Sequence, residues 1–243
     1  MRQRNAFTMT ELLVLIPVAA LLGASLLASV GVSQEKLKAA ACLNNMRQWG
    51  LGLALYANDY NDYWPYEGNA NPVEAGSDPN AWFNVVPPYI HQSRLVDLYD
   101  AGKPPTPLTK GIWTCPSATN TTVVPTFATP YFMYAFNGRM DPNGSAQFKR
   151  SQLISPTNTI VFAEEAENNF PLTTGNYCPA RHFGGGNFAM GDGHAEWITF
   201  QDFCRNANPG CTNPTVEEYS NAVNGDWMPG NKYHWFPYPG APT

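Results

Sequence analysis

The chain has 243 residues, of which 44% are hydrophobic and 14% charged, and it contains 22 Pro and 20 Gly. This length accommodates one compact domain with an additional segment, or two small domains. The low charge and abundant Pro and Gly disfavour a helical bundle. Acidic residues outnumber basic ones by 19 to 14, and no basic run is present, which argues against nucleic acid as a partner.

The N-terminus begins with a short basic stretch, residues 1–6, and continues into a long apolar run. No charged residue lies between Glu11 and Glu35, and the 19 residues 12–30 form a helix of about 29 Å, enough to cross a bilayer core. The two arginines of the basic stretch place this end in the cytoplasm, so we expect a single-pass inner-membrane protein with an exported head. A signal peptide cleaved after the apolar run is the alternative, but it leaves Glu11, at the edge of the span, unexplained.

Residues 7–16, Phe-Thr-Met-Thr-Glu-Leu-Leu-Val-Leu-Ile, resemble the processing signature of type IV prepilins and type II secretion pseudopilins. The resemblance implies that a prepilin peptidase cleaves between Ala6 and Phe7 and N-methylates Phe7, although the family usually has Gly where this chain has Ala6. Glu11 is then the acidic residue of the mature helix. Its carboxylate would pair with the α-amino group of Phe7 in a neighbouring subunit, so that neither charge is stranded in the bilayer.

The same resemblance implies a structural protein and no enzyme. Its subunits would form a homo-oligomeric filament through the N-terminal helix, with the help of the secretion or pilus assembly machinery in the inner membrane. The filament would be a type IV pilus-like fibre or a type II secretion pseudopilus, in the periplasm or at the cell surface.

The helix is predicted to continue beyond the membrane as an amphipathic segment. Apolar residues step by four and three from Cys42 to Tyr60, which is the spacing of one helix face, and this face should lie against a sheet. We expect the helix to end at 59–62, just before a Trp-Pro pair. Gly50 and Gly52 indicate close packing or a local kink. The stripe consists of Cys42, Met46, Trp49, Leu53, Tyr56 and Tyr60.

The rest of the chain is predicted to form the exported head. Short helices are expected from Asp78-Pro79 and over 93–99, with Ser93 as N-cap. One long helix followed by consecutive strands predicts an α+β fold of the type IV pilin kind, with a small antiparallel sheet on the helix and long loops. The expected strands are 112–115, 131–137, 159–164, 187–190 and 194–199. The expected divisions are a leader at 1–6, a transmembrane segment at 7–34, the amphipathic helix at 35–62 and the head at 63–243.

The densest motif begins at His182, which is followed after nine residues by Asp-Gly and then by His194. Asp192-Gly193 between two alternating segments predicts a β-hairpin with a type I′ turn. This spacing, together with the Cys, Asn-Asn and Tyr-Ala-Asn-Asp runs of residues 42–59, resembles one subgroup of prepilin-like proteins.

The two histidines and the aspartate of this motif allow three interpretations. His182, Asp192 and His194 would bind a divalent metal ion, or form a hydrolytic centre around that ion. In the third interpretation they are structural: His182 bonds the hairpin, and Asp192 satisfies the amides of its own turn. We prefer the third, and no other cofactor is indicated.

The five cysteines show no C-x-x-C spacing, which argues against a zinc knuckle or a thioredoxin-like motif. In an exported head they are disulfide candidates. Cys204 and Cys211 are close enough for a local loop, and Cys42 with Cys115 would tie the first helix to the head. Cys178 is then left over, and several free buried thiols are the alternative.

The last forty residues are rich in aromatic side chains among Pro and Gly. If exposed, these rings could stack on sugars, which gives the alternative function of a membrane-anchored extracytoplasmic binding module for carbohydrate or another ligand. If folded back, they cover the sheet, and this interpretation is preferred. The residues are Trp227, Tyr233, His234, Trp235, Phe236 and Tyr238.

Overall fold

The computed structural model describes the chain in several ranges. They are residues 9–68, 78–118, 125–126, 130–140, 147–168, 170–173, 175, 178–203, 232–239 and 241, with the backbone alone for 11, 12, 20–30 and 166–168. The predicted processing residues Ala6 and Phe7, the side chain of Glu11, and both Cys204 and Cys211 lie outside this description. The chain divides into two units, Met1–Lys38 and Ala39–Thr243.

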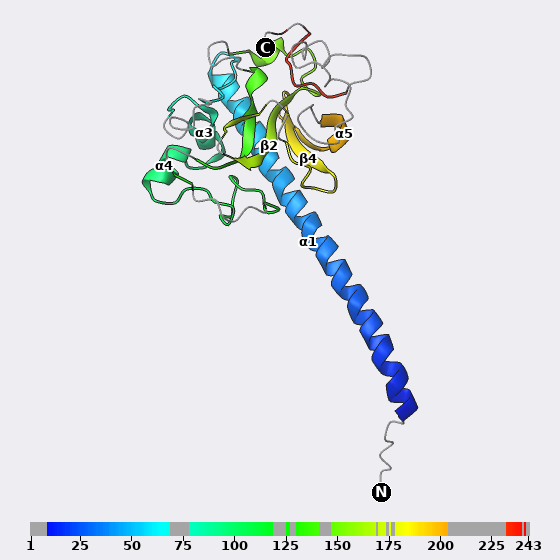
Figure 1. The fold of residues 1–243 in the computed structure, drawn as a ribbon. Helices are drawn as coiled ribbons and strands as arrows, with labels where there is room; N and C mark the ends of the chain where they lie inside the picture. The colour runs from blue at the N-terminus through cyan, green and yellow to red at the C-terminus, as the bar shows by residue number, and fades with distance from the viewer. Residues whose placement is uncertain are drawn as a thin grey trace. The chain divides into compact units, whose positions relative to one another are not determined.

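The long N-terminal helix α1 spans Met9–Asp59 and contains Pro17 (Figure 1). It ends where predicted, because Asn61 and Asp62 adopt positive φ angles of 54° and 72°, a backbone conformation that terminates a helix. Among the residues described with their side chains, no helix has the length and apolarity needed to span a bilayer. The span predicted at 7–34 extends beyond those residues and stays a prediction.

The second part of α1, residues 39–59, belongs to the head, and we call it the head segment of α1. Cys42, Met46, Trp49, Leu53 and Tyr56 are all buried, as the helical spacing predicted. Tyr60, the last residue of the predicted stripe, is instead 50% exposed, because the helix has already ended at Asp59. Its ring stacks on that of Tyr56 with centroids 4.2 Å apart.

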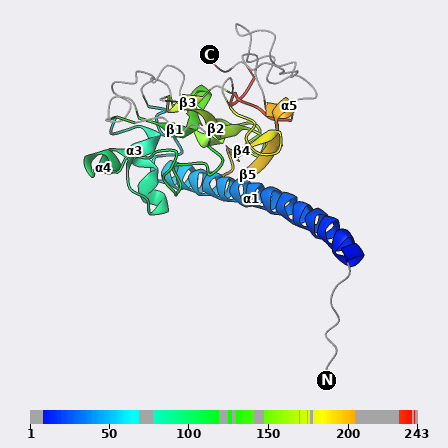
Figure 2. The same ribbon diagram turned by 60° about the horizontal axis from the view of Figure 1, so that its bottom comes forward.

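The sheet has five strands in the order β3-β1-β2-β4-β5, and the head segment of α1 lies beneath it (Figure 2). The short helices α3 (Trp82–Val85) and α4 (Leu95–Asp100) lie toward β1, and α5 (Phe200–Phe203) lies toward β5. The pairs β1–β2, β2–β4 and β4–β5 are antiparallel. The expectation of an antiparallel sheet is corrected at one edge, where the two-residue strand β3 pairs with β1 in parallel. The α+β fold is otherwise confirmed. The strands are β1 Phe132–Asn137, β2 Ile160–Asn168, β3 Leu172–Thr173, β4 Gly185–Met190 and β5 Ala195–Thr199.

The strand predicted at 112–115 is wrong, since these residues form turns. Their carbonyl groups accept hydrogen bonds from side chains of α1 instead of from a neighbouring strand. Trp49 Nε1 donates to the Ile112 carbonyl at 3.1 Å, and Asn45 Nδ2 donates to the Thr114 carbonyl at 3.1 Å. This segment is therefore fixed to the helix and not to the sheet.

Both predicted short helices begin later than expected. Asp78 accepts a hydrogen bond from the Asn80 amide at 2.9 Å, which makes a local Asx turn and delays the helix start to Trp82. Ser93 is no N-cap, because Arg94 occupies that position without a side-chain capping bond. The short helices are α3 Trp82–Val85, η1 Pro87–Ile90, α4 Leu95–Asp100, η2 Gly138–Met140, η4 Arg150–Gln152 and α5 Phe200–Phe203.

The predicted β4–β5 hairpin is confirmed, but its turn type is not I′. Gly193 has a positive φ of 92°, whereas Asp192 does not have a positive φ. The Gly193 amide donates to the Met190 carbonyl at 2.9 Å, and the Met190 amide donates to the His194 carbonyl at 2.8 Å. This is a three-residue loop, in which a turn of type I geometry is followed by a left-handed glycine.

The sheet separates two hydrophobic cores. Neighbouring residues of a strand point to opposite faces, and on β4 Ala189 belongs to the core shared with α1 while Phe188 belongs to the second core. The second core also contains Tyr233, Trp235 and Phe236. The described C-terminal aromatic residues thus fold back on the sheet, which confirms the preferred interpretation for them, whereas Trp227 lies outside the described residues.

Candidate functional site

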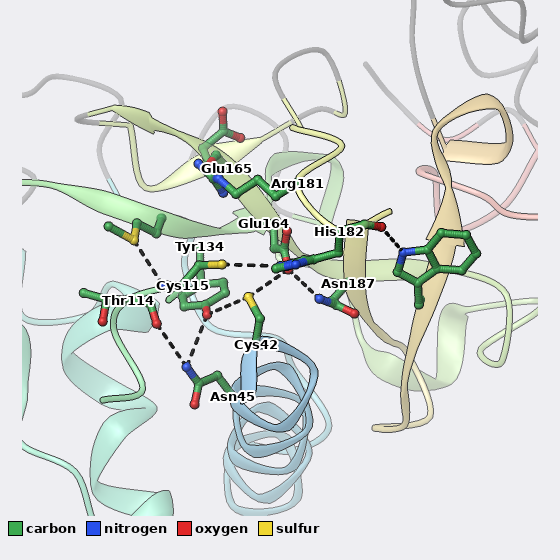
Figure 3. Close-up of polar contacts among 12 residues, drawn as sticks. Cys42, Asn45, Thr114, Cys115, Tyr134, Glu164, Glu165, Arg181, His182 and Asn187 are labelled. Atoms are coloured by element: carbon green, nitrogen blue, oxygen red, sulfur yellow. Dashed lines mark hydrogen bonds and ion pairs between the residues drawn. The ribbon is translucent and has the colours of Figure 1, made fainter. Parts of the chain in front are cut away.

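Four side chains with metal-ligating or nucleophilic atoms meet between the head segment of α1 and the sheet (Figure 3). Their donor atoms all lie within 4.8 Å of one another, and all four residues are buried. Each comes from a different segment: α1, the turns at 111–118, β2 and the turn before β4. We call this group the four-residue cluster; it consists of Cys42, Cys115, Glu164 and His182.

The sheet register places the carboxylate of the cluster. Tyr134 of β1 lies directly opposite Glu164 of β2. Ala163 pairs with Phe188, and the same register sets Asn187 of β4 opposite Glu164. Cross-strand neighbours share a sheet face, so these side chains form a row facing α1. Within this row, Asn187 Nδ2 donates a hydrogen bond to Glu164 Oε1 at 2.7 Å.

Helix α1 supplies one thiol and holds the segment that carries the other. Cys42 and Asn45 are three residues apart and therefore share one helix face. Asn45 Nδ2 lies 3.1 Å from the Gly111 carbonyl and 3.3 Å from the Tyr134 hydroxyl. These hydrogen bonds connect the turns before Cys115 to both the helix and the sheet.

A tight turn fixes His182. Its amide donates to the Gly185 carbonyl at 3.0 Å and its carbonyl accepts from the Gly185 amide at 3.1 Å. Phe183 and Gly184 between them have φ angles of 54° and 78°, as in a type I′ turn, at a position where no such turn was predicted. A positive φ is strained for a bulky residue such as Phe183. The His182 carbonyl also accepts a hydrogen bond from Trp197 Nε1 at 2.7 Å.

The cluster is held by short polar contacts that centre on one carboxylate oxygen. Glu164 Oε1 lies 2.9 Å from Cys42 Sγ, which donates to it, and 3.2 Å from His182 Nε2. Cys115 Sγ lies 3.3 Å from the same His182 Nε2, and the Tyr134 hydroxyl lies 3.1 Å from Cys42 Sγ. The second oxygen, Glu164 Oε2, is buried and has no hydrogen-bond partner among the described residues.

Burial and proximity give the two thiols opposite properties. Burial, with Cys115 and the Glu164 carboxylate acting in the same direction, raises the pKa of the Cys42 thiol far above its usual range. A hydrogen bond from Cys42, aided by His182, lowers the pKa of Cys115 to about 6 against the effect of burial. Burial also opposes a charged His182, but hydrogen bonds with Cys115 and Glu164 raise the pKa of its imidazole to about 9. The directions of these two pKa shifts favour a Cys115 thiolate beside a His182 imidazolium.

A thiolate beside an imidazolium is the pairing of a cysteine nucleophile, but two features argue against this chemistry. In a catalytic triad the acid contacts the imidazole nitrogen that does not face the nucleophile. Here Glu164 and Cys115 both approach Nε2 of His182. All the residues of the cluster are also buried, which keeps a substrate from the sulfur.

The predicted cysteine pair is close in space, but Cys42 and Cys115 are free thiols, which corrects the predicted disulfide. Cys178 is also a free, buried thiol, and its sulfur lies 3.6 Å from the Thr173 hydroxyl. The alternative of several free buried thiols therefore describes these three residues.

The structure does not gather the histidine motif into a single site. Asp192 and His194 lie together on the hairpin loop, with Oδ1 of the former 2.6 Å from Nδ1 of the latter. Asp192 Oδ1 also accepts the His194 amide at 3.1 Å, so it satisfies an amide of its own turn. His182 instead belongs to the four-residue cluster, and it contacts the hairpin through its backbone.

Sequence reasoning missed Glu164 as a site residue. Its one local signal is that two acidic residues, Glu164 and Glu165, directly follow the apolar residues 160–163 of a predicted strand. Its contact with Cys42 joins residues 122 positions apart, a pairing that no local spacing indicates.

The fold and the site define an α+β protein whose long N-terminal helix packs on a five-stranded mixed sheet and encloses a buried cluster of two thiols, an imidazole and a carboxylate. The chain belongs to the family described as "Protein of unknown function (DUF1559)", whose model matches residues 35–159. The matched range includes Cys42, Cys115 and strand β1. No curated protein and no solved structure matches the chain.

Proposed function

We propose that this protein is a structural, prepilin-like subunit that is anchored in the inner membrane by residues 7–34 and carries its head outside the cytoplasm. In this proposal a prepilin peptidase cleaves between Ala6 and Phe7, and the mature subunit assembles into a type IV pilus-like or type II secretion pseudopilus filament. The head is a structural element and has no enzymatic role.

The exposure of apolar residues at the start of α1 carries the proposal. Met9 is 87% exposed, and Leu13 75%, while the apolar face from Cys42 to Tyr56 of the same helix is buried in the head. An exposed apolar helix surface of this kind requires lipid or other apolar helices around it. The other large apolar residues exposed there are Val14, Leu15, Ile16 and Val18.

The N-terminal signature indicates how neighbouring subunits contact one another. A carboxylate at Glu11 next to lipid is costly unless a positive charge pairs with it. The α-amino group that cleavage creates at Phe7 is such a charge, and a neighbouring subunit can deliver it. Glu11 therefore acts in subunit docking.

The mature N-terminus and the Glu11 side chain provide the test. Mass spectrometry of the protein from its native membrane should find an N-terminal, methylated Phe7. Glu11→Ala should abolish filaments in electron microscopy at unchanged protein level. The matched control is Glu35→Ala, which removes another acid of α1 that pairs with Lys38 on the surface and should leave filaments intact.

The proposal would be wrong if the native chain began at Met1 or after Ala28, or if Glu11→Ala assembled as well as the wild type. The alternative, an extracytoplasmic binding module that uses exposed C-terminal rings, gains no support from Tyr233, Trp235 and Phe236, since all three are buried.

A further inference from the structure

The donor atoms of the four-residue cluster match the ligand preferences of one class of metal ion. Two thiols, one imidazole and one carboxylate are the sulfur, nitrogen and oxygen ligands of Zn²⁺, and four such ligands complete its tetrahedral shell. The two soft sulfur ligands exclude Mg²⁺ and Ca²⁺, which bind oxygen ligands. The four side chains converge from segments that are far apart in sequence, as Figure 3 shows.

The charge of the cluster also calls for a cation. Glu164 is completely buried, with an exposed fraction of 0%, and its Oε2 has no hydrogen-bond partner among the described residues. A buried carboxylate oxygen without a partner is costly. Within the cluster His182 is the only residue that can carry a positive charge. A divalent cation bound among these groups would supply the buried carboxylate with a second positively charged partner.

The distances are compatible with such an ion. Zn–S bonds of ~2.3 Å and Zn–N and Zn–O bonds of ~2.1 Å place the donor atoms of a tetrahedral site about 3.3 to 3.8 Å apart. The cluster has separations of 2.9 Å between Cys42 Sγ and Glu164 Oε1, 3.2 Å between Glu164 Oε1 and His182 Nε2, and 3.3 Å between His182 Nε2 and Cys115 Sγ. Small movements of these side chains admit the ion.

We propose that Cys42, Cys115, Glu164 and His182 form a structural Zn²⁺ site inside the head. The two sulfurs bind as thiolates and His182 binds through neutral Nε2, so the protons of the Cys42 thiol and of the His182 imidazolium leave to solvent when the ion enters. The site is closed, because the four protein ligands fill the shell and all are buried, which leaves no position for water or substrate. Asn187, whose amide bonds Glu164 Oε1, orients the carboxylate from outside the shell.

The ion would link the helix to the rest of the head. Cys42 lies on α1 and Glu164 on β2, whereas Cys115 lies on the turns at 111–118 and His182 on the turn before β4. A structural Zn²⁺ contributes directly to folding free energy, because the unfolded chain has no preformed site. The inference goes beyond the proposed filament role and does not depend on it.

Full-length protein in detergent, purified with reduced thiols, is the sample for the test. After removal of metal with a chelator, titration with Zn²⁺ should end at one ion per chain and raise the midpoint of thermal unfolding. Titration with Co²⁺ should produce visible bands of a tetrahedral ion together with thiolate-to-cobalt charge transfer. Those bands report sulfur ligation, which adventitious surface binding does not give.

Variants identify the ligands. Cys115→Ser and His182→Ala should each weaken Zn²⁺ binding by more than the ~10- to 100-fold that follows loss of an outer-shell partner. Cys178→Ser is the matched control, since it removes a buried thiol outside the cluster and should leave stoichiometry and spectrum unchanged. Cys115→His distinguishes loss of a ligand from misfolding. It keeps a zinc ligand and should retain the ion with weaker charge-transfer bands.

The proposal is overturned if reduced wild-type protein binds no Zn²⁺ and shows no thermal shift, or if its Co²⁺ complex lacks thiolate charge transfer. It is equally overturned if Cys42 and Cys115 of the native protein are joined as a disulfide and the reduced protein does not bind the ion. Loss of the ion from Cys178→Ser to the same extent as from Cys115→Ser would also contradict it.

Discussion

At the scale of single residues, Gly50 shows how closely α1 and the sheet approach one another. A Cβ atom at this position would lie 2.9 Å from the Gly193 carbonyl oxygen and 3.1 Å from the Ala189 Cβ. Both neighbours belong to the β4–β5 hairpin, so the hairpin loop rests directly on the helix. The sequence had indicated close packing or a kink at Gly50, and the packing explains this glycine.

Gly50→Ala should therefore destabilise the head, although alanine favours helix. The helix propensity gain is about 1 kcal/mol, whereas the displacement of a backbone carbonyl in a packed core costs about 1–3 kcal/mol and leaves a net loss. Chemical denaturation monitored by near-UV circular dichroism measures this change in the free energy of unfolding. Gly31→Ala is the control, because a Cβ there meets nothing within 4 Å; equal effects of the two substitutions would refute the packing argument.

At the scale of secondary-structure elements, the length of β4 sets the distance between two contacts that the turns at its ends make with α1. The turn at its start holds His182 in the four-residue cluster near Cys42, and the loop at its end places Gly193 against Gly50. The nine residues between His182 and Asp192 therefore span both contacts. This gives a structural reason for the spacing of the motif in this chain.

Insertion of one alanine between Asn187 and Phe188 should disrupt the head. A shift of one residue turns each following side chain to the opposite sheet face. The inserted alanine would then replace Phe188 in the second core, a change that costs about 3–5 kcal/mol, and Phe188 would be forced into the packed core at the place of Ala189. We expect a loss of at least ~3 kcal/mol in urea denaturation. The same insertion between Gln92 and Ser93, two exposed loop residues, should change stability by under ~0.5 kcal/mol. A loss there as large as in β4 would contradict the conclusion that the register of β4 causes the effect.

Local sequence patterns predicted the elements whose conformation depends on residues close to one another in the sequence. Helical spacing identified the buried face of α1, and alternating strands located β4 and β5. The patterns failed where distant groups compete for the backbone, as at Ile112, whose carbonyl bonds Trp49 instead of a strand. The cluster was predicted only in part: Cys42 was paired with Cys115 and His182 was a metal-site candidate, but Glu164 joins them through the sheet register.

At the scale of the whole molecule, the chain combines two units with different requirements. Both hydrophobic cores and the four-residue cluster lie in Ala39–Thr243, whereas the described part of Met1–Lys38 exposes its apolar side chains. The first unit depends on its surroundings for stability, and the second contains its own core.

A chain that begins at Glu35 should consequently fold without detergent. Calorimetry should show one cooperative transition with a midpoint close to that of the full chain in detergent, because none of the described core residues precedes Glu35. Sedimentation should find it in the supernatant, while the full-length chain stays with the membranes. Absence of a cooperative transition in the shortened chain would mean that residues before Glu35 contribute to the core.

The aromatic residues around Trp49 give this molecule an intrinsic optical reporter. The Trp49 ring of α1 lies 5.3 Å from that of Trp82 and 5.0 Å from that of Trp113, centroid to centroid, in edge-to-face arrangements. Indoles this close couple their excited states, so the near-ultraviolet dichroism and emission of the head depend on whether the helix is docked. Native fluorescence can therefore follow separation of α1 from α3 and from the turns at 111–118 during unfolding, without an added dye.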